Sequence, residues 1–150
     1  MKQSPQMENL EKVLRSSKLV AGGFMGSDSR CLSEIIESDI AQIETLGFNV
    51  KQIADRMQEI TQIAKPQLGN WIKINEMIEG VSQDYKGIIV CPWPHSGKFD
   101  KRITTVKRAK TGATIFWSDL NMHLIAKHDF FEGRGSNFRI EPKELIEIIF

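Results

Sequence analysis

Residues 102–117 read RITTVKRAKTGATIFW, and this stretch decides the fold class. Two segments rich in β-branched and aromatic residues, 102–108 and 113–117, flank a short turn at 109–112. Such an arrangement predicts an antiparallel β-hairpin. Two more strands are expected upstream, since residues 71–74 alternate apolar and polar side chains and residues 87–91 are apolar and followed by prolines.

Helical patterns lie on both sides of these strands. Before Pro66, cap residues, glycines and apolar positions three and four apart predict three helices. After the hairpin, a helix is expected from Ser118 or Asp119 to about His128, and Pro142 opens a last one. The first three are expected over residues 5–22, 28–46 and 50–65, with Ser27 and Asp28 capping the second.

These elements predict an α+β fold, in which an antiparallel sheet in the C-terminal half is packed by N-terminal helices and two C-terminal helices. The 150 residues, with a helical part about 1–66 and a strand-rich part about 71–150, suit one domain.

The net charge of +1 predicts neither nucleic-acid binding nor attraction to a membrane. Two cysteines make no disulfide framework, and charged residues near the N-terminus exclude a signal peptide, so we expect a cytoplasmic protein.

Cys91, His95, His123 and His128 form a candidate metal site. Nitrogen and sulfur ligands suit zinc or another divalent metal. One geometric objection stands, because side chains five apart on a helix point about 140° away from each other. His123 and His128 would then face one ion only if the helix ended between them. Alternatively, His128 complements the helix dipole, or the rings line a metal-free polar pocket.

Asp39 lies in the middle of the apolar stripe of the second predicted helix, between Ile36 and Ile43. A helix that buries this stripe also buries the carboxylate, which then needs a partner. Asp39 is therefore either an acid or base at a functional site or a structural residue bound to an arginine or to backbone amides.

Three glycine- and serine-containing segments are candidates for anion binding: residues 26–30, 95–98 and 133–136. Free amides before a helix, or flexible glycines beside arginines, hold phosphate and carboxylate groups. The alternative for each is an ordinary turn or cap. The candidate ligand-binding residues are Asp28, Arg30, Lys98, Arg134, Ser136 and Arg139.

Several of these segments carry a resemblance. Met25-Gly26-Ser27-Asp28, Cys91-Pro92 with His95, and the region from His123 to Arg139 with Phe130-Phe131, Gly133 and Gly135-Ser136 resemble a family of small bacterial cytosolic proteins. The similarity spans roughly Gly26 onward. It implies a bacterial, cytosolic, single-domain protein and carries no activity with it.

Three functional hypotheses follow. The first is a small ligand-binding protein or enzyme whose pocket, receptive to a small anion, is built from His95, His123, His128, Arg134 and Arg139, with Asp39, His95 and His123 as catalytic candidates. The second is an interaction module for a protein or nucleic-acid partner that uses a basic hairpin of Lys98, Lys101, Arg102, Lys107, Arg108 and Lys110. The third is a metal-dependent hydrolase. Convergence of the histidines and Asp39 favours the first, and a continuous exposed basic edge favours the second.

Overall fold

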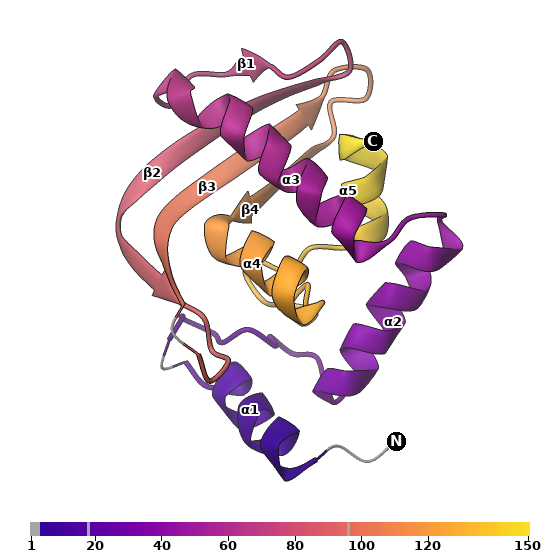
Figure 1. The fold of residues 1–150 in the computed structure, drawn as a ribbon, viewed down its shortest axis with the longest axis vertical. Helices are drawn as coiled ribbons and strands as arrows, with labels where there is room; N and C mark the ends of the chain where they lie inside the picture. The colour runs from indigo at the N-terminus through magenta and orange to yellow at the C-terminus, as the bar shows by residue number, and fades with distance from the viewer. Residues whose placement is uncertain (1–3, 18, 96) are drawn as a thin grey trace.

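A computed structural model describes residues 4–17, 19–95 and 97–150 and confirms the α+β class. Its sheet has four antiparallel strands in the order β1-β2-β3-β4. Figure 1 shows α3 lying across the sheet, with α4 and α5 beside it and α1 and α2 near one end. The strands are β1 (Ile72–Lys73), β2 (Ile78–Val90), β3 (Lys98–Arg108) and β4 (Thr114–Ser118). The helices are α1 (Pro5–Arg15), α2 (Leu32–Thr45), α3 (Val50–Ala64), α4 (Asp119–His128) and α5 (Pro142–Ile149).

The predicted hairpin is present as β3 and β4, which pair from Ile103 with Ser118 to Lys107 with Thr114. The larger hairpin, however, is β2 with β3, paired from Ile78 with Arg108 to Val90 with Lys98. The first half of β2 was not predicted, because residues 82–87 are mostly polar and show no apolar alternation. A bulge between Tyr85 and Ile88, where Gly87 has a φ of 112°, lets the pairing continue around the bend.

Two predicted helix boundaries are wrong. The first helix ends at Arg15, well before Gly22, because the Ser16 backbone is extended, with φ −78° and ψ 156°. The second begins only at Leu32, where Cys31 and Glu34 form a capping box. Asp28 does not cap it, because the Asp28 carboxylate is bound by Arg30.

Two buried apolar clusters, each with residues from both halves of the chain, make up the core. The larger joins α3 and α5 to the sheet, with the fully buried Trp117 donating from Nε1 to Thr61 Oγ1 at 3.0 Å. The smaller packs α1 and the start of α2 against Cys91 and α4. Because α4 gives Ile125 to the first cluster and Leu124 to the second, it is held between them.

Candidate metal centre

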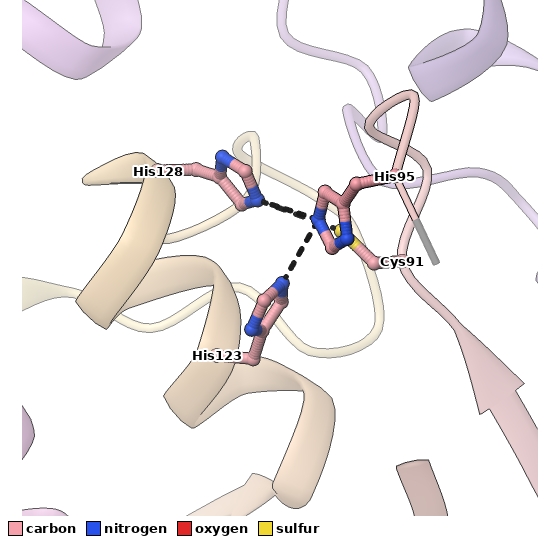
Figure 2. Close-up of side chains that lie close together, drawn as sticks. All are labelled: Cys91, His95, His123 and His128. Carbon is pink, nitrogen blue, oxygen red and sulfur yellow. Dashed lines mark hydrogen bonds between the residues drawn. The ribbon is translucent and has the colours of Figure 1, made fainter. Parts of the chain in front are cut away.

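Cys91, His95, His123 and His128 converge in the structure. His123 and His128 project from α4, while Cys91 and His95 lie on the segment between β2 and β3 (Figure 2). The Nε2 atom of His95 lies 3.2 Å from Nε2 of His123 and 3.2 Å from Nε2 of His128. The Cys91 Sγ atom is 3.6 Å from Nε2 of His128. One ligand atom from each residue lies within 4.8 Å of the other three, so this group could hold a metal ion.

The geometric objection from the sequence is overturned. Helix α4 includes both histidines, yet their rings approach the same point (Figure 2). His128 is the last helical residue, so no following turn restricts its side chain. Its ring stacks on Trp93 with 4.1 Å between centroids, and this contact holds the ring in place beside His95.

The segment from Cys91 to Gly97 is shaped to present two ligands. The Cys91 amide donates to the Gly97 carbonyl at 3.0 Å, which closes the segment into a loop. Within the loop, the His95 amide donates to the Trp93 carbonyl at 2.7 Å. A Cβ atom on Gly97 would lie 2.8 Å from Cε1 of His95, so glycine leaves the room that the ring needs.

Three of the six spacings among the ligand atoms are those of a tetrahedral zinc site, and the other three lie within 4.8 Å. Bond lengths of about 2.0–2.1 Å to nitrogen and 2.3 Å to sulfur place tetrahedral ligand atoms roughly 3.3 Å apart for two nitrogens and 3.6 Å for nitrogen and sulfur. The two nitrogen separations of 3.2 Å and the sulfur separation of 3.6 Å agree with these values.

Hydrogen bonding alone accounts poorly for this arrangement. A neutral imidazole carries either one proton or one lone pair at Nε2, yet Nε2 of His95 has two nitrogen neighbours at 3.2 Å. Within residues 4–17, 19–95 and 97–150, no carboxylate contacts the three rings. A central cation would use all three lone pairs at once.

The electrostatics favour the neutral form of His123 and His128. Burial and the neighbouring rings lower the pKa of His128 to about 4. Burial, with His95 and Lys127, also lowers the pKa of His123. Neutral imidazole is the form that binds metals, so these ligands are ready near neutral pH without losing protons. Burial raises the pKa of Cys91, so the thiol is held protonated, and a cation that bound there would have to displace the proton to solvent.

Asp39 and Arg139 lie apart from the imidazoles and bind each other. The Arg139 guanidinium donates to both oxygens of Asp39, at 2.6 and 2.9 Å, and both side chains are buried. Arg139 also donates to the Glu132 carbonyl and to Glu141. Asp39 is therefore bound to an arginine, as expected if its role is structural, and the structure does not bring it to the histidines.

Two of the three predicted anion sites, residues 26–30 and 133–136, are filled by the protein's own Asp28, and the third, residues 95–98, includes Ser96, which lies outside the described residues. Its carboxylate accepts from the Arg30 amide and guanidinium and from the Arg134 amide, at 2.7 to 3.1 Å. This pairing holds the pKa of Asp28 well below its usual range. The Ser136 hydroxyl donates to Glu132 at 3.1 Å, and Lys98 is exposed at the start of β3. None of these residues contacts the histidines in the described part of the chain, so the five-residue pocket is not assembled.

The basic hairpin is not a free edge. β3 is an inner strand of the sheet. Arg102 is bound by Asp84 and Asp119, and Arg108 donates to the carbonyls of Ile148 and Phe150. Only the lysines Lys98, Lys101, Lys107 and Lys110 are left exposed along it.

Sequence reasoning missed Glu132, which is 4% exposed and has a left-handed φ of 66°. Its carboxylate accepts from Asn121 Nδ2 at 2.9 Å and from Ser136 Oγ at 3.1 Å. Burial raises the pKa of Glu132 to about 7. The sequence signal that could have found Glu132 is its position directly after Phe130-Phe131. Apolar residues within a loop indicate that the segment is buried, and both phenylalanines are buried in the structure.

The raised pKa of Glu132 predicts a pH-dependent stability. The pKa of Glu132 is near 7 in the folded state and near 4.5 in the unfolded state. The contribution of Glu132 to the free energy of unfolding is therefore full below pH 4.5 and is lost as the pH rises through 7. The loss is on the order of 3 kcal/mol. Urea unfolding at pH 5 and pH 8 should show this decrease in the wild type and a smaller one in Glu132→Gln. Equal decreases in both proteins would assign it to other groups.

Comparisons with known proteins found no match: no protein-family model, no curated protein and no solved structure is significantly similar to this chain. Among the described helices, none is long and apolar enough to cross a membrane.

Proposed function

We propose that this protein binds one zinc ion, or a closely related divalent transition metal, through Cys91, His95, His123 and His128. The observation that carries the proposal is the convergence of one thiol and three imidazole nitrogens from two separate segments within 4.8 Å of one another. Neutral imidazole with a thiolate is a donor set that zinc prefers.

The number of ligands favours a structural or regulatory role for this metal. Four protein ligands complete a tetrahedral sphere, whereas catalytic zinc sites keep one position for water or substrate. A metal here would fasten the loop of residues 91–97 to the C-terminal turn of α4. A hydrolase, as considered from the sequence, would require one ligand to leave, and His95 is the most exposed of the four.

The proposal suits a reducing compartment such as the cytoplasm. Both cysteines, Cys31 and Cys91, are free thiols. A thiol that must ligate a metal is preserved where disulfides are rare.

The direct test is metal content combined with a spectroscopic probe. Protein purified without chelator should contain about one zinc per chain by elemental analysis. Cobalt(II) in place of zinc should give the intense visible bands of a tetrahedral site and a thiolate-to-cobalt band in the near ultraviolet. Cys91→Ser should lose the thiolate band, and His123→Ala should lose most of the bound metal.

Cys31 supplies a matched control, because it is the second free cysteine and lies at the start of α2, outside the cluster. Cys31→Ser should keep both the metal and the thiolate band. Wild-type protein that takes up no zinc or cobalt from a metal-buffered solution would refute the proposal.

A further inference from the structure

Glu132 is a buried acid with no partner cation among the residues that the structure describes. Three acidic side chains are buried in the described residues: Asp28 at 6%, Asp39 at 3% and Glu132 at 4% exposure. Asp28 pairs with Arg30 at 2.7 Å, and Asp39 pairs with Arg139 at 2.6 Å. Within residues 4–17, 19–95 and 97–150 the Glu132 carboxylate forms no ion pair, and Arg139 donates to the Glu132 backbone carbonyl instead. Buried carboxylates are normally paired, so Glu132 differs from the other two, and its burial is the cause of its raised pKa.

The surrounding structure holds Glu132 firmly in place. A left-handed backbone is unfavourable for a non-glycine residue, and its φ of 66° is such a conformation. The next amide, that of Gly133, donates to the Phe24 carbonyl at 2.8 Å. Each carboxylate oxygen accepts one hydrogen bond, from Asn121 or from Ser136, which leaves each with further acceptor capacity. The side chain is therefore fixed but able to bind another donor.

Glu132 lines a pocket of about 320 Å³ between the segment 19–24, strands β2 and β3 and the loop at Phe138. The residues that line the pocket are mostly apolar, and two of these residues, Leu19 and Ile88, are 41% and 57% exposed. This volume suits a small ligand. Lys101 also lines the pocket and forms no ion pair with any described residue. None of the four proposed metal ligands borders it.

We propose that this pocket binds a small apolar molecule that carries a primary ammonium group, with the ammonium on the Glu132 carboxylate. The apolar part would cover the exposed walls, which gains free energy on burial. The ammonium supplies a countercharge that no described side chain gives to the Glu132 carboxylate, through a charge-assisted hydrogen bond. Two kinds of molecule have this chemistry. An apolar amino acid has a carboxylate besides the ammonium, and Lys101 is the cation available to bind that carboxylate, whereas a simple amine has the ammonium alone.

Three probes with the same apolar body separate these chemistries. L-leucine has both charged groups, 3-methylbutylamine has only the ammonium, and 4-methylpentanoate has only the carboxylate. Binding is measured by calorimetry on zinc-loaded protein, and the methyl signals of Ile88, Ile89 and Ile103 are followed by NMR. We expect leucine or the amine to bind at least about tenfold more tightly than 4-methylpentanoate and to shift these signals. Leucine binding more tightly than the amine would identify an amino-acid site.

Glu132→Gln tests the role of the carboxylate while keeping its shape, and Glu37→Gln, on the exposed face of α2, is the matched control. We expect the first to weaken ammonium binding by about tenfold or more and the second to leave it unchanged. Circular dichroism and zinc content report whether the variant is folded. Wild-type protein that binds neither ammonium probe, or that binds 4-methylpentanoate as tightly, would overturn the proposal. Because zinc content is measured on the same samples, failure of the metal site would be recognised separately.

Discussion

Removing the metal with a chelator is expected to lower the melting temperature of the zinc-loaded protein by roughly 8–16 °C. Binding to the folded state alone stabilises it by about 4 kcal/mol when free metal is a thousandfold above Kd. For a domain of this size, each kcal/mol shifts the melting temperature by about 2–4 °C. The measurement is thermal unfolding by circular dichroism with buffered zinc and again with chelator.

The physical reason for this large effect is the position of the ligands. His123 and His128 are on α4, which packs into both apolar clusters, and Cys91 and His95 are on the loop that ends the longest strand of the sheet. A metal therefore crosslinks segments that are far apart in the sequence, and unfolding must break that link. His128→Ala should show no zinc-dependent shift, whereas Cys31→Ser should keep it. A wild-type protein with equal melting temperatures in both buffers would contradict a bound metal.

The candidate metal residues could be predicted from the sequence, but their assembly could not. All three histidines and Cys91 fall within residues 91–128, and their chemistry alone indicates a metal. Their convergence depends on the long β2–β3 hairpin, whose first half carries no apolar alternation, and on a ring position that Trp93 fixes by stacking. Contacts between distant segments determine both features, and helical periodicity does not describe such contacts.

The grouping of charged residues was harder to predict. The sequence indicates that Asp39 is buried, since its position on α2 lies among apolar residues, and the structure agrees. The partner could not be chosen, because Arg139 lies 100 positions away in the chain. The amides near Arg30 and Arg134 did suit an anion, and the anion is the side chain of Asp28.

Breaking the Asp39–Arg139 pair from one side is expected to cost about 3 kcal/mol of unfolding free energy. Loss of one partner of a buried pair typically costs 3–5 kcal/mol, because the other charge is left without compensation. Arg139 would retain Glu141, whose side chain is 41% exposed, so the lower part of that range applies to Asp39→Ala. Urea unfolding measures the change, and Asp55→Ala, which breaks the exposed pair with Lys51, is the control with little expected effect.

The double variant Asp39→Leu with Arg139→Met distinguishes an electrostatic cost from a packing cost. Replacing both charges by apolar groups of similar size is often close to neutral, so this protein should recover much of the stability that Asp39→Ala loses. If Asp39 serves only to bind Arg139, the double variant should also keep its zinc. If the double variant is as unstable as Asp39→Ala, the uncompensated charge is not the source of the cost, which then lies in packing or in the hydrogen bonds that Arg139 makes within the C-terminal loop to Glu132 and Glu141.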